Sequence, residues 1–355
     1  MKVLILGASY GSLLATKLLA AGHDATLVCT AGTARLIESE GTVVRLPLRD
    51  RDEPVELRSG KLPGTLAAAE PDAVDPAGFE LVVLAMAEPQ YGASGVRELL
   101  ARIAAARVPA MAIMNMPPPP YLERLPGVDV AALAPCYTEP GLWEGFEPAL
   151  VTLASPDPQA YRPDGEGKNV LEVSLPTNFK VARFADDAPT ALLARLERDI
   201  RAVEYPLAGG QRVALPVHVR LFESLYVPLA KWAMLVTGNY RAVTADGVRS
   251  IRDAVHGDLE RSRALYGEVC ALCVALGADA DDMVPFEKYA RAAEGLSAPS
   301  SAARAIDGGA TRIERVDALV RGIARQRGIA IEELEATVAL VDERLAANRA
   351  REGDG

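Results

Sequence analysis

Residues 1–29 constrain the fold more than any other part of the chain. Residues 2–6, KVLIL, form a short apolar run that ends at Gly7 and predicts a buried strand. Leucines at helical spacing then fill residues 11–21, and the apolar run ATLVC at 25–29 predicts a second strand. A strand, a tight turn, a helix and a second strand make a βαβ unit, which favours a parallel sheet.

The turn after the first strand carries an altered glycine pattern. A dinucleotide site needs a tight turn, close approach of the backbone to a pyrophosphate, and close packing of helix on strand. Gly7 meets the first need, whereas Ser9 and Ser12 stand where two more glycines are expected, with Gly11 between them. Serine is small, and the free amides at a helix start attract phosphate whatever the side chains are. The predicted cofactor-binding residues of this turn are Gly7, Ala8, Ser9, Tyr10, Gly11 and Ser12.

Strand and helix patterns alternate along the first part of the chain, which predicts a doubly wound, mainly parallel sheet. The expected strands include 81–87, 109–115, 130–139 and 149–155, and the expected helices include 93–106 and 188–203. The Pro- and Gly-rich segment 156–169 predicts an exposed loop, and the runs LEVSL and KVARFA that follow could extend the sheet. Beyond about residue 215 the pattern becomes helical. We therefore expect a Rossmann-like α/β domain at 1–207 and an all-helical domain at 208–355.

Charge and cysteine usage narrow the class of protein. The net charge of −10 argues against nucleic acid or an anionic membrane as partner. No apolar stretch is long enough to span a bilayer, and the start of the chain lacks a signal-peptide pattern. The four scattered cysteines imply no disulfide framework, and Cys270 and Cys273 lie in a helix-like run that favours packing over a metal or redox site. We expect a cytoplasmic protein without a metal.

The end of the second predicted strand bears on the choice of cofactor. An acidic residue there would bind a ribose 2′-hydroxyl, and a basic residue would accept a 2′-phosphate. The chain has Cys29 and Thr30 at this place, with Arg35 close behind and no acid between them. Thr30 and Arg35 therefore favour NADP as cofactor, with NAD as the alternative.

A second clue lies in the helical half, in LYVPLAKWAMLVTGNYRAVTA at 225–245. Lys231 and Asn239 stand eight residues apart on one predicted helix, on roughly the same face. A lysine and an amide that face a nucleotide domain could act as proton donor and substrate anchor.

Together with the opening turn, this segment resembles the ketopantoate reductase family. Lys231 matches the catalytic lysine of that family and Asn239 matches an asparagine, while Leu235 replaces a second asparagine. The resemblance implies a Rossmann domain followed by a helical domain like that of 6-phosphogluconate dehydrogenase. It also implies reduction of a 2-oxo acid by NADPH, with Lys231 as proton donor and Lys231, Leu235 and Asn239 facing the substrate.

Shorter stretches extend the likeness to the rest of the chain. AMAEPQY and IMNMPPPPYLERL resemble family segments at the domain cleft, which implies cofactor contacts for Gln90 and Asn115 and a catalytic role for Asn115. Ser300 and Ser301 resemble a serine pair of the family, one of which contacts substrate, and we take Ser300 as the candidate here. Arg312 stands where the family has a glutamate. An arginine there could clamp a carboxylate, so we expect a more anionic substrate than ketopantoate.

Two other interpretations remain open on the sequence. An opine-type dehydrogenase shares the two-domain plan, and His218 would then carry the acid–base role. A protein that binds the dinucleotide without turning it over would also fit the altered glycines, Leu235 and Arg312. Under each interpretation the helical half is expected to form a homodimer.

Overall fold

The computed structural model describes residues 1–49, 51–207 and 209–353, which form two compact units. The first unit comprises Met1–Met86, Gln90–Tyr121 and Gly141–Glu223, and the second comprises Ala87–Pro89, Leu122–Pro140 and Ser224–Gly355. The division after Glu223 falls later than the expected division after residue 207, because the last strands of the α/β part precede it. Ala87–Pro89 joins the second unit through Glu88, whose carboxylate accepts hydrogen bonds from the Thr138 amide and hydroxyl at 2.9 and 2.8 Å.

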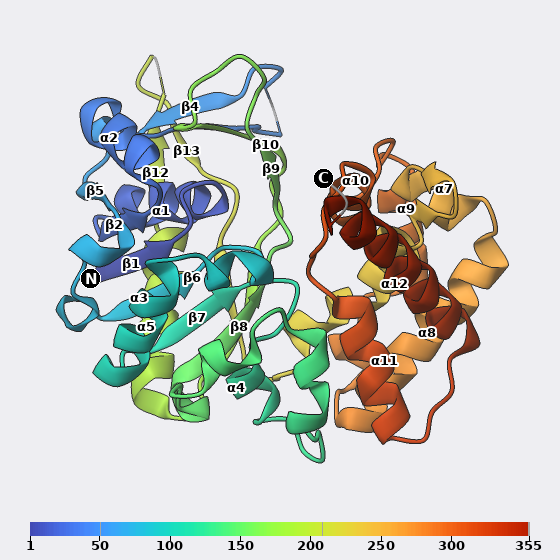
Figure 1. Ribbon diagram of the computed structural model, residues 1–355. Coiled ribbons are helices and arrows are strands. Elements are labelled where there is room, and N and C mark those ends of the chain that lie inside the picture. Colours follow the sequence, from blue (N-terminus) through green and yellow to red (C-terminus); the bar gives the residue numbers. More distant parts are fainter. Residues whose placement is uncertain (50, 208, 354–355) are drawn as a thin grey trace. The chain divides into compact units, whose positions relative to one another are not determined.

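The first unit is built on one large sheet (Figure 1). Among the described residues its strands are, in spatial order, β14 (Val219–Phe222), β11 (Phe179–Ala182), β8 (Val151–Ser155), β7 (Ala110–Ile113), β6 (Leu81–Leu84), β1 (Lys2–Leu6), β2 (Asp24–Val28) and β5 (Leu66–Ala69). All neighbours from β5 to β8 are parallel, and β11 is antiparallel to β8. From β5 to β8 this is the strand order of dinucleotide-binding sheets, so the predicted doubly wound sheet is confirmed.

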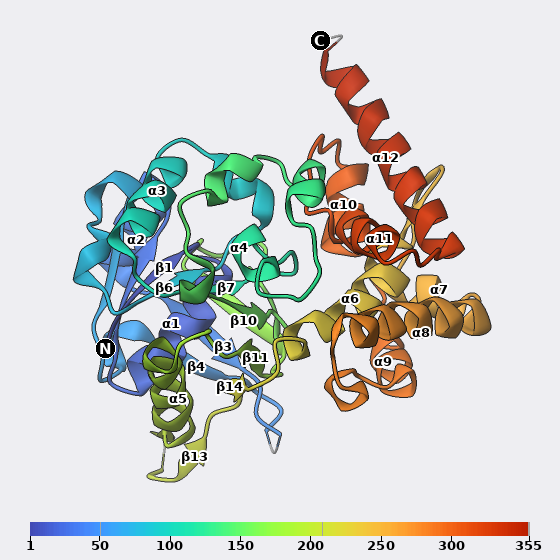
Figure 2. The same ribbon diagram turned by 90° about the horizontal axis from the view of Figure 1, so that it is seen from below.

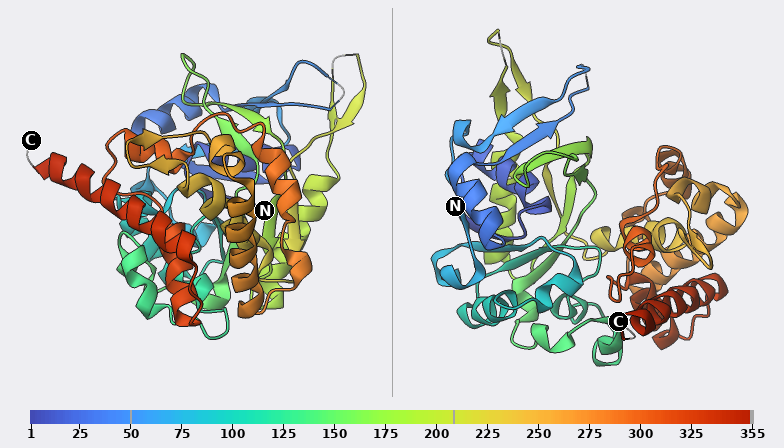
Figure 3. Two further views of the ribbon diagram at one scale, coloured as in Figure 1. Left: turned by 90° about the vertical axis from the view of Figure 1, so that its right-hand side faces the viewer. Right: turned by 45° about the horizontal axis from the view of Figure 1, so that its top comes forward.

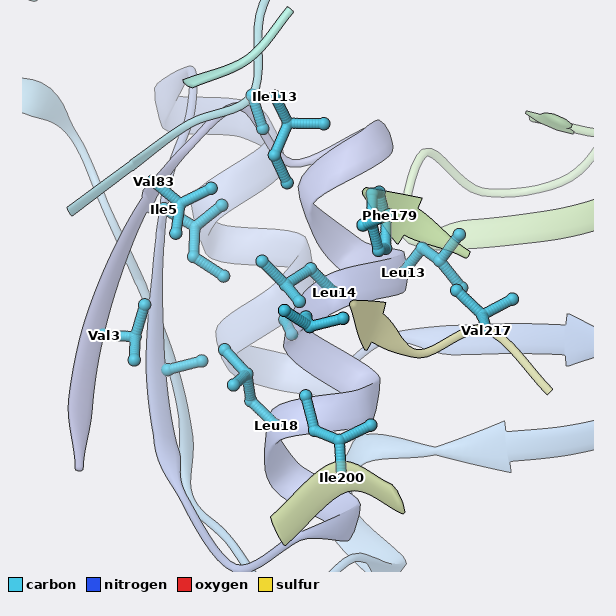
Figure 4. Packing of buried hydrophobic residues seen from close by; sticks show 14 of the residues in the cluster. Val3, Ile5, Leu13, Leu14, Leu18, Val83, Ile113, Phe179, Ile200 and Val217 are labelled. Carbon is cyan, nitrogen blue, oxygen red and sulfur yellow. The ribbon is translucent and has the colours of Figure 1, made fainter. Parts of the chain in front are cut away.

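Helices cover both faces of this sheet, and α1 is the most buried of them. The main helices of the unit are α1 (Tyr10–Ala20), α2 (Ala31–Glu40), α3 (Val96–Ala106), the short α4 (Pro119–Leu122) and α5 (Asp187–Arg201). Figure 2 shows α3 on one side of β1 and β6 and α1 on the other. In Figure 4, Leu14 and Leu18 of α1 pack between Ile5 of β1 and Ile200 of α5, all fully or almost fully buried. The periodic leucines of the sequence are therefore core residues.

A second, smaller sheet corrects part of the sequence-based expectation. Its strands are β4 (Val55–Arg58), β3 (Val43–Leu46), β10 (Val170–Leu175) and β9 (Gln159–Tyr161), in that order. Segment 156–169 is thus not wholly a loop, because β9 pairs with β10 as an edge strand. Of the two runs expected to extend the main sheet, only KVARFA does so, as β11. Residues 130–139 do not form a strand: Ala131–Cys136 is a 3₁₀ helix with Leu133 buried.

The second unit is mainly helical, as expected (Figure 3). Its longer helices are α7 (Ile251–His256), α8 (Leu259–Leu276), α9 (Phe286–Ala293), α10 (Ser301–Asp307), α11 (Val316–Gln326) and α12 (Glu332–Gly353). A small hairpin, β15 (Val243–Thr244) and β16 (Gly247–Val248), interrupts them. Cys273 is buried in α8 and Cys270 half-buried, and both are free thiols. No helix within the described ranges has the length and apolarity needed to cross a membrane.

Candidate active site

Gly7 is the residue that the first turn requires. It follows β1 with φ +106°, a conformation that side chains rarely adopt, and its amide donates to the Val28 carbonyl at 3.0 Å. A Cβ atom added there would lie 2.6 Å from the Ala85 carbonyl oxygen and 2.7 Å from Cγ of Met86, just beyond β6. The turn therefore lies between the ends of β2 and β6, which is where nucleotides bind in sheets of this order.

Gly11, and not Ser12, provides the close packing of helix on strand. A Cβ atom at Gly11 would lie 2.6 Å from Cγ2 of Ile5, so α1 can approach β1 only with glycine there. Ser12 is buried, and its hydroxyl donates to the Ala8 carbonyl at 2.5 Å. That hydrogen bond directs the Ser12 hydroxyl into the helix and away from a phosphate. Gly11 thus provides the close packing that the motif assigns to a glycine at position 12.

The other residues of the turn divide into exposed and packed ones. Ser9 occupies the N-cap position of α1 and is exposed, so its hydroxyl is available to a ligand. Tyr10 is packed instead: its hydroxyl donates to the Pro158 carbonyl at 2.6 Å, and its ring meets Phe179 edge-on at 5.8 Å. Only the backbone of Tyr10 remains for the predicted cofactor contact. Ala8 is buried as well.

Three further predicted residues follow neighbouring parallel strands. Thr30 follows β2 at the N-cap of α2, Gln90 lies in the 3₁₀ helix Glu88–Gly92 after β6, and Asn115 lies two residues beyond β7. Because the carboxyl ends of parallel strands share one edge of the sheet, Thr30, Gln90 and Asn115 lie on the same edge as Gly7. Thr30 and Gln90 are exposed and Asn115 is half-buried.

A groove of about 690 Å³ beside α2 changes the expectation for cofactor choice. Arg35 lines it, as the sequence suggested, but so do the carboxylates of Glu38, Glu70 and Asp72. Glu70 and Asp72 come from the end of β5, a strand that the sequence analysis did not identify. The end of β2 is therefore not free of acids in the folded chain.

A second cation lies near Cys29, the residue that follows β2. Burial raises the pKa of the Cys29 thiol to about 11, and the nearby guanidinium of Arg162 opposes part of that rise. Arg162 follows β9, in the segment that was expected to be only a loop. No motif could have assigned it, because its proximity to β2 depends on the second sheet.

In the second unit, Lys231 lies on the accessible side of an otherwise buried helical segment. From Tyr226 to Val243 the partly exposed residues are Lys231, Met234 and Asn239, and every other residue is buried. We call these three residues the accessible strip. Lys231 and Asn239 are thus both partly exposed, and Met234 lies between them in sequence as an apolar neighbour.

The three remaining residues that were predicted to bind substrate, Leu235, Ser300 and Arg312, lie outside the accessible strip. Leu235 is 4 % exposed, so Met234 and not Leu235 contributes apolar surface to the accessible strip. Ser300 is 2 % exposed, and its hydroxyl accepts from the Ala303 amide at 3.0 Å and donates to the Asn239 carbonyl at 2.7 Å. Arg312 is exposed in the segment between α10 and α11.

The segment that carries the accessible strip changes helix type along its length. Val227–Ala230 is a 3₁₀ helix, Lys231–Met234 is one α-turn, and Leu235–Tyr240 is a π-helix. π-helical turns are rare in proteins and occur often at functional sites. The sequence pattern of this stretch predicts one regular helix and gives no sign of the change of helix type.

His218 is a poor candidate for a proton donor at neutral pH. Burial lowers its pKa to about 4, and the positive charges of Lys17, Arg201 and Arg220 add to that effect. Its ring is therefore neutral at pH 7, which weakens the opine interpretation.

Comparisons with known proteins give similarity of structure only. No protein-family model matches the chain. No curated protein sequence matches it either. Among solved structures, the chain is similar to 2-dehydropantoate 2-reductase from Methylococcus capsulatus, with a TM-score of 0.66, 15% identity and 98% of both chains covered.

Two further structures share the fold over their whole length. A D-mandelate dehydrogenase with NADH and anilino(oxo)acetate has a TM-score of 0.64 and 13% identity, covering 98% of this chain and 100% of the other. The dimeric ketopantoate reductase from Staphylococcus aureus has a TM-score of 0.59 and 11% identity, with 98% and 100% covered. The sequence resemblance is thus confirmed for the fold: the chain has the α/β and helical architecture of ketopantoate reductases and D-mandelate dehydrogenase.

Proposed function

We propose that the protein is a nicotinamide-dependent reductase of a small 2-oxo acid, with Lys231 as the proton donor. The single observation that carries this proposal is the accessible strip, in which a lysine and an amide flank an apolar residue on a segment that is otherwise buried. The fold is that of enzymes whose names specify 2-dehydropantoate and D-mandelate, a 2-oxo acid and a 2-hydroxy acid.

The first turn fits a dinucleotide. Without a side chain, Gly7 lets the turn approach the Ala85 carbonyl just beyond β6, where a Cβ atom would lie 2.6 Å from the carbonyl oxygen. Ser9 and the first amides of α1 would hold the pyrophosphate, and Thr30, Gln90 and Asn115 would contact the rest of the cofactor along the same edge. When bound, the reduced nicotinamide supplies the hydride.

The residues of this chain would then handle the proton and the orientation of the substrate. The Lys231 ammonium would donate a proton to the carbonyl oxygen of the substrate as negative charge develops there. Asn239 would hydrogen-bond the substrate, Met234 would contact its side chain, and Arg312 would attract its carboxylate. These contacts would fix the carbonyl carbon in one orientation.

The groove beside α2, which would bind the adenosine part of the cofactor, supports weak discrimination between NADPH and NADH. Arg35 and Arg162 favour the 2′-phosphate of NADPH, whereas Glu38, Glu70 and Asp72 favour the free ribose hydroxyls of NADH. We propose that NADH binds about as well as NADPH. Equilibrium titrations with both nucleotides test this, and an Arg35→Ala variant should weaken NADPH binding alone.

Replacement of Lys231 tests the proposal itself. Lys231→Met should lower kcat/KM by about 10²- to 10⁴-fold, the usual contribution of one general acid. Oxidation of NADPH and NADH is followed with ketopantoate, phenylglyoxylate and pyruvate, each with and without an added amino acid. Lys288→Met on the exposed side of α9 is the matched control and should leave the rate unchanged.

The outcomes separate the alternatives. Full activity in Lys231→Met would refute the proton-donor role, and a reaction that depends on the amino acid would favour the opine interpretation. Tight cofactor binding with no turnover on any of these substrates would favour a protein that only binds the dinucleotide. We also propose a homodimer, because the structurally similar ketopantoate reductase from Staphylococcus aureus is dimeric, and light scattering measures the mass.

A further inference from the structure

The π-helix Leu235–Tyr240 governs the geometry of the accessible strip. In a regular α-helix, residue 239 would lie roughly 80° around the axis from residue 231, because eight steps of about 100° overshoot two turns. A π-turn takes more residues than an α-turn, and so it reduces that offset. The angle around the helix axis between Asn239 and Lys231 therefore depends on which helix type these six residues adopt.

Two side-chain hydroxyls from other elements bind the backbone at the two ends of this π-helix. Tyr289 of α9 donates to the carbonyl of Met234, the residue just before the π-helix, at 3.0 Å. Ser300, at the N-cap of α10, donates to the carbonyl of Asn239 at 2.7 Å. Both are almost fully buried, so each hydrogen bond is made away from water.

Gly238 completes this arrangement inside the π-helix. A Cβ atom there would lie 2.1 Å from the Tyr289 hydroxyl oxygen and 2.9 Å from Cγ2 of Ile251. The phenol group of Tyr289 thus occupies the space that a side chain at 238 would need. The Tyr289 hydroxyl can therefore reach the π-helix only because residue 238 is a glycine.

We propose that the Tyr289 hydroxyl, together with Ser300 and Gly238, holds Leu235–Tyr240 in the π form and thereby positions Asn239 beside Lys231. Tyr289 is then a positioning residue for the reaction proposed above, and the inference rests on that function. It acts through the Met234 carbonyl, and its own ring stays in the core, stacked on Tyr266 at 5.4 Å.

The test compares two buried tyrosines that lose the same kind of hydrogen bond. Tyr289→Phe removes the bond to Met234, and Tyr266→Phe removes a 2.8 Å bond to the Val284 carbonyl, outside the π-helix. Two readouts are taken on each full-length variant: backbone hydrogen exchange of peptides covering 232–243, and kcat and KM for a 2-oxo acid that the wild-type protein reduces.

We expect Tyr289→Phe to speed exchange in 232–243 and to lower kcat by about 10- to 100-fold, with a smaller change in KM. Tyr266→Phe should leave both readouts near the wild-type values even if it lowers the melting temperature equally. Equal effects of the two variants on exchange and kcat would overturn the proposal, because the hydroxyl of Tyr289 would then contribute only to general stability.

A double variant tests the fit between Gly238 and Tyr289. Gly238→Ala alone should impair kcat severely, and in the Tyr289→Phe background it should impair kcat less, because the nearest atom that the new Cβ meets is gone and the remaining close contact is with a methyl group of Ile251. Additive losses would contradict the proposed fit. If the wild-type protein reduces no 2-oxo acid, the proposed function fails, and the exchange readout alone still decides whether Tyr289 holds the π-helix.

Discussion

Among single residues, Gly7 and Gly11 have different structural roles in the first turn. Gly7 provides a conformation with positive φ and a close approach to the Ala85 carbonyl, whereas Gly11 lets α1 pack against Ile5. Ser12 stabilises the start of the helix through its bond to Ala8. Gly7 and Gly11 therefore provide the tight turn and the helix–strand packing of a dinucleotide-binding motif, although their spacing differs from that of the regular motif.

The first prediction concerns Gly7. Gly7→Ala should destabilise the protein by at least about 1 kcal/mol more than Gly22→Ala, because both positions have positive φ but only Gly7 has atoms in the way. It should also weaken binding of the reduced nucleotide. Urea unfolding and fluorescence titration measure the two effects. Equal stability losses in the two variants would mean that the turn adjusts without cost.

At the scale of elements, the segment that leads into β14 carries an unusual conformation. Val217 is fully buried and has φ +66°, a region that a β-branched residue seldom adopts. The flanking chain is held on both sides: the Lys17 ammonium donates to the Pro216 carbonyl at 2.8 Å, and the Asn178 side chain accepts from the His218 amide at 2.8 Å. Surrounding contacts impose the strain that Val217 bears.

The second prediction follows from that strain. Val217→Gly should cost about 1–2 kcal/mol less stability than Val219→Gly, because glycine relieves the left-handed conformation only at 217. Both valines are 1 % exposed, so the lost burial is matched. Denaturant unfolding of the two variants measures the difference. A larger loss at 217 would contradict the account.

Elements also differ in how far the sequence predicts them. The strands Lys2–Leu6, Asp24–Val28 and Leu81–Leu84 were predictable, from the runs at 2–6, 25–29 and 81–87, because continuous apolar runs are buried on both faces of a parallel sheet. LAAA at 66–69 has no β-branched residue, and only its pairing with β2 makes it a strand. The π-helix was unpredictable for a similar reason, since its hydrogen-bond partners Tyr289 and Ser300 come from distant helices.

At the scale of the whole molecule, Lys17 links stability to pH. It is 1 % exposed in the middle of α1, and burial lowers its pKa from 10.5 to about 7. Its ammonium donates to the Leu215 and Pro216 carbonyls at 3.2 and 2.8 Å. Between pH 7 and 10.5 the unfolded chain keeps a proton on this lysine that the folded chain releases, so this group favours folding increasingly as pH rises.

The third prediction is the resulting pH dependence. From pH 7 to pH 9.5, the stability of the wild-type protein should rise relative to that of Lys17→Met by about 1 kcal/mol per pH unit. Lys168→Met, at an exposed position of the same unit, should run parallel to the wild type. Urea unfolding at several pH values measures all three proteins. Parallel curves for Lys17→Met and the wild type would show that the lysine titrates normally.

The α/β fold, the βαβ unit at the first turn and the helical second part follow from the sequence alone. Those features depend on local apolar patterns, which can be recognised in the sequence without knowledge of tertiary contacts. Only the tertiary structure decided that Gly11 makes the close contact, that Glu70, Asp72 and Arg162 lie near the end of β2, and that Met234 rather than Leu235 joins Lys231. These depend on contacts between segments far apart in the chain, which no local pattern encodes.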